Sequence, residues 1–146
     1  MIKVELRTHT TFEADFPDDA EFVESRDIKR PGGLGIARVL CRMFQGRGFE
    51  VSEPEQHSFY GWAFVVSEED LAVWFLLQFP GPWLLLSQVR TSLVRRFFSS
   101  RSVSRHRRIL EILNDSLAHD NRFREIKWFS KKQFEEGGGR SGERTP

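Results

Sequence analysis

Three strongly apolar segments occupy the middle of the chain, at residues 60–66, 71–79 and 83–89. Their tryptophan, phenylalanine and valine content favours β-strands, and Pro80 and Pro82 would interrupt a helix here. Loops of three or four residues separate the segments. Because such short loops join antiparallel neighbours, the pattern predicts a three-stranded antiparallel meander at the centre of a sheet.

Both faces of the middle strand are apolar. One alternate set is Leu71, Val73, Phe75, Leu77 and Phe79, and the other is Ala72, Trp74 and Leu76. An antiparallel sheet usually has one solvated face, so each face of this one needs a cover. We expect helices on one face. For the other, the sequence leaves open another segment of the same chain, a partner protein or a second copy of the chain.

Period-two alternation also runs from residue 2 to residue 16. A straight strand of that length would span roughly 50 Å, so we expect a bend or break near residues 8–11. An acidic connection follows at residues 17–33, and Gly32 and Gly33 precede a predicted helix. The apolar stripe of this helix is Ile36, Val39, Leu40, Met43 and Phe44.

The second half of the chain again contains patterns typical of strands and of amphipathic helices. Phe49 and Val51 predict a short strand, and a second amphipathic helix is predicted over residues 103–119. A last strand is predicted over residues 122–129. Ser130, with Gln133 three positions later, then matches a capping box that opens a short terminal helix.

This order of elements predicts an α+β fold: a two-layer sandwich in which an antiparallel sheet, with the meander at its centre, carries two helices packed mainly on one face. We expect one globular domain over residues 1–134. Residues 135–146 are rich in glycine and arginine and predict a flexible tail. A chain of 146 residues with 39% hydrophobic content is large enough to fold without disulfides or metals.

Composition narrows the range of functions. The net charge is +1, so no global field draws the chain to nucleic acid or to anionic lipid. A single cysteine, Cys41, excludes an internal disulfide, and the charged start of the chain does not match a secretory signal. No apolar run approaches the roughly 20 residues of a membrane-spanning helix. We therefore expect a cytoplasmic protein with no membrane contact and no cofactor.

Short motifs suggest relatives. They are FP followed by DAE at residues 16–21, PGG at 31–33, GFEVSEPE at 48–55, GWAF at 61–64 and RFREIKWF at 122–129. This pattern resembles a group of small, uncharacterised bacterial α+β proteins and covers most of the chain outside the tail. The resemblance implies a bacterial single-domain protein and carries no activity, cofactor or catalytic residue.

Charge is segregated along the sequence. Residues 13–27 hold seven acidic side chains and one basic one, whereas residues 90–108 hold seven arginines and no acid. The two stretches either pair with each other or face a partner. In the second case the basic stretch suits phosphates, stacked bases or an acidic protein surface. Its candidate binding residues are Arg90, Arg95, Arg96, Phe97, Phe98, Arg101, Arg105, Arg107 and Arg108.

Catalytic signals are few. Cys41 lies on the first predicted helix with no histidine near it in sequence, and the chain has no nucleophile elbow or phosphate-binding loop. An anion at the start of that helix is an alternative to a plain turn. Glu53, Glu55 and His57 would point the same way in an extended segment, where they could bind a divalent metal or share acid–base work; solvated loop charges explain them equally.

These observations favour a non-catalytic bacterial protein-binding module of the immunity-protein, adaptor or chaperone type, with a protein partner or a homodimer as its complex. Nucleic-acid binding through the arginine-rich segment is the first alternative. An enzyme or metal site around Glu53, Glu55 and His57 is the second.

Overall fold

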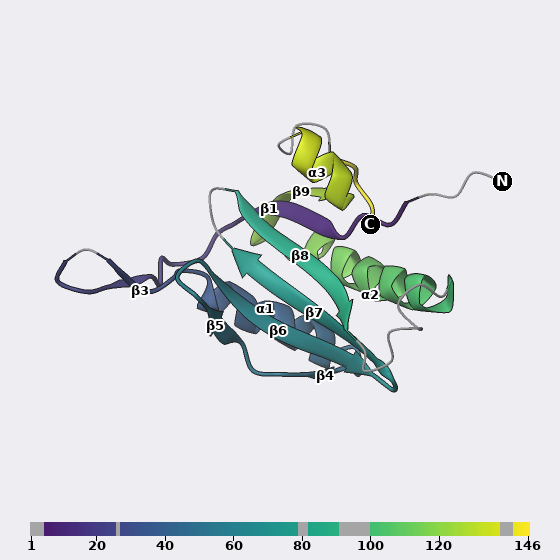
Figure 1. The fold of residues 1–146 in the computed structure, drawn as a ribbon, viewed down its shortest axis with the longest axis horizontal. Coiled ribbons are helices and arrows are strands. Elements are labelled where there is room, and N and C mark those ends of the chain that lie inside the picture. Colours follow the sequence, from purple (N-terminus) through teal and green to yellow (C-terminus); the bar gives the residue numbers. More distant parts are fainter. Residues whose placement is uncertain (1–4, 26, 79–81, 91–99, 138–141) are drawn as a thin grey trace.

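The computed structural model describes residues 5–25, 27–78, 82–90, 100–137 and 142–146 (Figure 1). This part of the chain has the predicted α+β class, with helices packed against one antiparallel sheet. The elements are β1 (His9–Ala14), β2 (Glu21–Phe22), β3 (Ile28–Arg30), α1 (Leu34–Gln45), β4 (Glu50–Val51), β5 (Glu55–His57), β6 (Gly61–Glu68), β7 (Leu71–Gln78), β8 (Trp83–Arg90), α2 (Ser100–Ala118), β9 (Phe123–Phe129) and α3 (Lys131–Gly137).

The described strands form a seven-stranded sheet in the order β4-β6-β7-β8-β1-β9, with β5 also paired to β6. Strands β6, β7 and β8 are the predicted meander, and all their pairings are antiparallel. β1 lies between β8 and β9. It begins only at His9, and its register against β9 shifts between Thr11 and Glu13. The alternation from residue 2 to residue 16 thus gives a described strand only from His9, within the region where a bend or break was expected, and residues 2–4 lie outside the described residues.

Helices α1 and α2 lie on the same face of the sheet, as predicted, and contact each other (Figure 1). Their apolar stripes meet the large side chains of the meander. The ring of Phe44 on α1 lies 5.3 Å from that of Phe75, which stacks on Phe64 at 5.2 Å. Phe44 and Phe75 are completely buried. This layer is the hydrophobic core.

The chain covers much of the opposite face itself. α3 lies over β1 and β9, where the ring of Phe134 contacts those of His9 and Phe129 at 5.5 and 6.0 Å. On the meander, the Arg90 guanidinium lies 4.3 Å from the ring centroid of Trp74. Within the described parts of β6, β7 and β8, no large apolar side chain is exposed. Of the three covers left open by the sequence, the chain's own segments therefore supply part of the cover of this face.

Two short elements do not match the sequence prediction. The stretch at 17–33, predicted as a plain connection, contains the β2–β3 hairpin, in which Glu21 pairs with Arg30. β5 was also not predicted. It continues the edge that β4 begins, because Ser52 lies between the two strands and bonds to Val65 on β6 in both directions: Ser52 N–H donates to the Val65 carbonyl at 2.9 Å and Val65 N–H to Ser52 Oγ at 2.8 Å.

The C-terminal part of the chain contains the predicted capping box. Ser130 N–H donates to Gln133 Oε1 at 3.0 Å, and Gln133 N–H donates to Ser130 Oγ at 3.1 Å, at the start of α3. Glu143 exchanges two backbone hydrogen bonds with Trp128, at 2.7 and 2.8 Å, and Pro146 is buried. Residues 142–146, part of the tail expected to be flexible, therefore contact the domain at β9.

Candidate binding site

Exposed apolar side chains gather at one end of the molecule. Six large apolar side chains are exposed in the described part of the chain, and five of them belong to the β2–β3 hairpin and the turn between β5 and β6. We call these five the hairpin–turn patch: Phe22, Val23, Ile28, Phe59 and Tyr60. The sixth, Val103, lies on α2. Figure 1 shows the hairpin projecting from the end of the domain that carries the patch.

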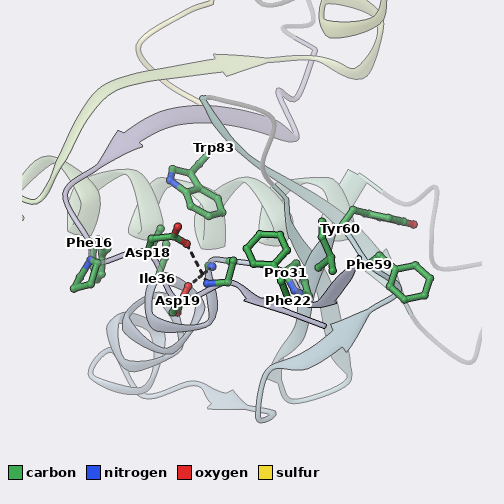
Figure 2. A pocket seen from close by; sticks show the side chains of 14 residues that line it. Phe16, Asp18, Asp19, Phe22, Pro31, Ile36, Phe59, Tyr60 and Trp83 are labelled. Atoms are coloured by element: carbon green, nitrogen blue, oxygen red, sulfur yellow. Dashed lines mark hydrogen bonds between the residues drawn. The ribbon is translucent and has the colours of Figure 1, made fainter. Parts of the chain in front are cut away.

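The patch surrounds a cavity of about 450 Å³, which we call the Trp83 cavity. Phe22, Ile28, Phe59 and Tyr60 contribute to its wall, together with Trp83 from the start of β8. Figure 2 labels Phe22, Phe59, Tyr60 and Trp83 among the side chains that line it. A second hollow adjoins it and shares Ile28 and Phe59 with it. The exposed apolar side chains of the patch therefore line two hollows that share Ile28 and Phe59.

The turn before α1 forms one wall of the Trp83 cavity and is held between two tryptophans. Trp62 Nε1–H donates a hydrogen bond to the Pro31 carbonyl at 3.0 Å. On the other side, Trp83 packs on Gly33, where a Cβ would lie 2.7 Å from the indole. Gly33 also has φ 108°, a left-handed conformation that favours glycine. These contacts fix the wall independently of any ligand.

The start of α1 is occupied by a carboxylate of the same chain. Asp19 accepts hydrogen bonds from the backbone N–H groups of Gly33 at 2.7 Å and Gly35 at 2.8 Å. A negative group is stabilised at this position because the first N–H groups of a helix have no partner within it. Asp19 therefore occupies the position at the start of α1 where the sequence left open a bound anion. Beside it, Asp18 accepts a hydrogen bond from Ala20 N–H at 3.0 Å.

The charged side chains that line the Trp83 cavity are both acidic. Asp18 and Asp19 are the charged residues among the described residues that line it. The nearby Arg30 pairs with Glu21 at 3.5 Å and lies 5.8 Å from the ring centroid of Trp62. The recess therefore combines aromatic walls with negative charge.

Two of the described arginines in the arginine-rich stretch bind acidic groups of the same chain. Arg105 donates to Asp70 at 2.7 Å and to the Glu68 carbonyl at 2.9 Å, and Arg108 donates to both carboxylate oxygens of Glu68 at 2.9 and 3.0 Å. The end of β6 and the loop that follows it thus neutralise two of these arginines. Arg101 is exposed and Arg107 is partly buried on α2. Four candidates lie outside the described residues: Arg95, Arg96, Phe97 and Phe98.

The acidic stretch also has its own partners. Arg124 on β9 donates to Glu13 at 3.0 Å and to Asp15 at 2.5 Å. Together with the pairing of Glu21 and the cap made by Asp19, these contacts bind much of the acidic stretch to residues outside 90–108. The ion pairs and hydrogen bonds described for the two charged stretches therefore join each of them to other parts of the chain and not to each other.

Glu53, Glu55 and His57 do not converge on a metal. Nowhere in the described chain do three His, Cys, Asp or Glu side chains come close enough to hold one. β5 begins at Glu55, so Glu53 lies outside the alternation that would align the three. The His57 ring contacts the rings of Tyr60 and Trp74, each at 5.5 Å. The metal-site alternative is therefore not supported by the geometry.

Cys41 is a poor nucleophile. The side chain is buried on α1, and its thiol hydrogen bonds to the Ser52 carbonyl at 3.8 Å. Burial, with a smaller contribution from the charge of Glu53, raises the pKa of the thiol to about 12. The reactive thiolate is therefore scarce at neutral pH.

A buried serine–histidine pair has no signal in the sequence. Ser87 Oγ lies 2.8 Å from His106 Nε2 and 3.1 Å from the Thr8 carbonyl, beside a hollow of about 630 Å³. The Ser87 hydroxyl can donate to the Thr8 carbonyl or to His106 Nε2, according to the histidine tautomer. Burial lowers the pKa of His106 to about 4, below the value near 7 that suits a general base at neutral pH. The pair satisfies the polar atoms of two buried side chains.

No family model matches the chain, and no curated protein or solved structure matches it either. The resemblance to small bacterial α+β proteins thus stays a prediction. Among the described helices, none is long and apolar enough to span a membrane.

Proposed function

We propose that this chain is a non-catalytic protein-binding module that docks a partner on the hairpin–turn patch. The observation that carries the proposal is that five of the six exposed large apolar side chains of the described chain line two hollows that share Ile28 and Phe59. Adaptors, immunity proteins and dedicated chaperones all act by docking of this kind.

The patch has features that the fold does not require. A short two-stranded hairpin is marginally stable in water, and Phe22 leaves 59% of its surface exposed on that hairpin. Phe59 is 66% exposed in the adjoining turn. Monomeric proteins rarely expose contiguous apolar patches without a function, and aromatic side chains are enriched in the centres of protein interfaces. A partner that covered the patch would therefore gain apolar burial that the chain alone lacks.

Charge favours a protein over a nucleic acid as the partner. The Trp83 cavity carries Asp18 and Asp19, which repel phosphates. Arg105 and Arg108, two of the arginines considered for nucleic-acid binding, are engaged by Glu68 and Asp70. The proposed docking mode thus uses a different surface from the basic stretch.

The test compares Ile28→Ser with Val103→Ser, because the two side chains are 39% and 38% exposed but only Ile28 lies in the patch. Proteins crosslinked to the wild-type chain in its native cells are identified, and the binding of each to both variants is then measured. Loss of a central apolar contact costs about 2 kcal/mol, or roughly a 30-fold rise in Kd. We expect this loss for Ile28→Ser and no change for Val103→Ser.

A second copy of the chain is the other protein that the patch could bind. Sedimentation equilibrium over a range of concentrations distinguishes this case, since a dimer formed through the patch would be present in wild type and absent in Ile28→Ser. Equal binding by both serine variants, in the crosslinked complexes and in sedimentation alike, would refute the proposal.

A further inference from the structure

The two ends of the Trp83 cavity differ in chemistry. Figure 2 shows Asp18 and Asp19 on the side of Phe16 and Ile36, whereas Phe59 and Tyr60 stand on the opposite side. The exposed aromatic side chains thus lie across the cavity from the carboxylates. A ligand that fills the recess meets apolar surface along its length and negative charge at one end.

The carboxylates of Asp18 and Asp19 differ in how firmly hydrogen bonds hold them in place. Asp19 uses one oxygen for Gly33 N–H and the other for Gly35 N–H, so the α1 N-terminus holds it in place. Asp18 is exposed and uses one oxygen for Ala20 N–H. Since a carboxylate has about four acceptor positions, both retain the capacity to accept bonds from a ligand. The charge at this end of the cavity is therefore fixed in position and still accessible.

The size of the cavity suits a bulky side chain. Its volume of about 450 Å³ falls within the range of roughly 300–1,000 Å³ found for ligand pockets. Its depth is lined by Ile36 and Trp83, and Gly33 leaves room for the indole. An anchor side chain from a partner would displace water from apolar walls, which is the usual role of an interface hot spot.

We propose that the Trp83 cavity binds a segment of a partner protein that places a bulky apolar side chain in the recess and a lysine or arginine beside it, at the Asp18 end. This inference rests on the proposed function and specifies its partner. Opposite charge at the rim orients and accelerates docking, while an acidic segment would be repelled. Arginine suits this position well, because its planar guanidinium can bind a carboxylate through two hydrogen bonds.

An unbiased library of displayed 12-residue peptides tests the inference on the full chain. We expect wild type to enrich peptides in which a bulky apolar residue has lysine or arginine within a few positions, and Ile28→Ser to lose that enrichment. Enrichment of apolar peptides without a basic preference, again lost in Ile28→Ser, would refute the inference and leave the proposed function standing. Enrichment that Ile28→Ser does not change, or none at all, would count against both.

A charge variant measures the electrostatic part directly. Asp18→Asn keeps an oxygen that can accept the Ala20 N–H bond and removes only the charge. A synthetic peptide with a phenylalanine anchor flanked by lysine should bind this variant 3- to 10-fold more weakly at low salt. The same peptide with serine in place of lysine should bind wild type and variant equally. Glu111→Gln, at an exposed position on α2, is the control and should change neither affinity. Equal binding of the lysine peptide to wild type and Asp18→Asn would overturn the inference.

Discussion

Asp19 and Gly33, fourteen positions apart, are joined by a hydrogen bond of 2.7 Å from the Gly33 N–H to the Asp19 carboxylate. The second oxygen of Asp19 reaches Gly35, so a residue of the preceding loop caps α1. The segment that leads into the β2–β3 hairpin is thereby fastened to a helix of the core. The position of the hairpin–turn patch depends on this attachment.

Replacement of the cap should destabilise the fold. Asp19→Ala leaves two N–H groups at the start of α1 without their acceptor, and loss of such a cap costs about 0.5–2 kcal/mol. Urea denaturation measures the change in the free energy of unfolding. Glu24→Ala removes an exposed acid of the same segment and should change stability little. Equal stability of the two variants would show that Asp19 is not a cap in solution.

Two glycines at the start of α1 should respond in opposite directions to alanine. Gly33→Ala forces a Cβ to within 2.7 Å of Trp83 at φ 108°, so strain and overpacking together should cost about 2–4 kcal/mol. At Gly35 the nearest atom to an added Cβ is Asp19 Oδ2 at 3.5 Å, an ordinary contact. Gly35→Ala should therefore be neutral or stabilising by up to about 1 kcal/mol. Thermal unfolding of both variants tests the pair; similar losses would contradict the packing of Trp83.

His106 should make the fold sensitive to acid. Its pKa is about 4 in the folded chain and 6.5 in the unfolded chain, so both states are neutral above pH 6.5 and the histidine then contributes nothing. Between pH 6.5 and 4 the unfolded state binds a proton that the folded state does not. Stability should therefore fall across this window as pH is lowered, by about 3 kcal/mol from this group.

Denaturant titrations at several pH values measure the pH dependence of the unfolding free energy. His106→Gln should flatten it, whatever the absolute stability of the variant. His119→Gln, at a histidine with a side chain 77% exposed, should leave it as in wild type. An unchanged slope in His106→Gln would contradict the burial of a neutral imidazole.

Cys41 should resist alkylation until the chain unfolds. With its pKa raised from 9.0 to about 12, the thiolate fraction at pH 8 is lower by roughly 1,000-fold, and burial blocks access as well. The rate of reaction with iodoacetamide, followed by mass spectrometry, should rise by at least that factor in concentrated denaturant. Fast labelling of the native chain would show that α1 opens readily.

The parts of the fold that the sequence predicted are those with local, periodic signals. The meander and both long helices follow from patterns within single segments, and the capping box of Ser130 and Gln133 is readable from spacing alone. The β2–β3 hairpin has no such signal, since its strands hold two and three residues and are exposed on both sides.

The candidate site was beyond this kind of prediction for a similar reason. Its apolar side chains come from two segments about thirty positions apart, and each segment alone is typical of a loop. The apolar faces of the meander were correctly predicted, but local patterns do not show which side chains cover them, such as Arg90 packed on Trp74. That the exposed apolar surface lies at the hairpin and the neighbouring turn is visible only in the folded chain.

The return of Glu143 to Trp128 has a consequence for how separate molecules behave. β9 is the last strand of the sheet, and an unpaired outer strand can recruit the same strand of another molecule. Because Glu143 bonds to the N–H and the carbonyl of Trp128, these two groups are not free to pair with a strand of another molecule. A chain shortened to end at residue 137 would lose both hydrogen bonds, and its tendency to aggregate should increase even if its core remained intact.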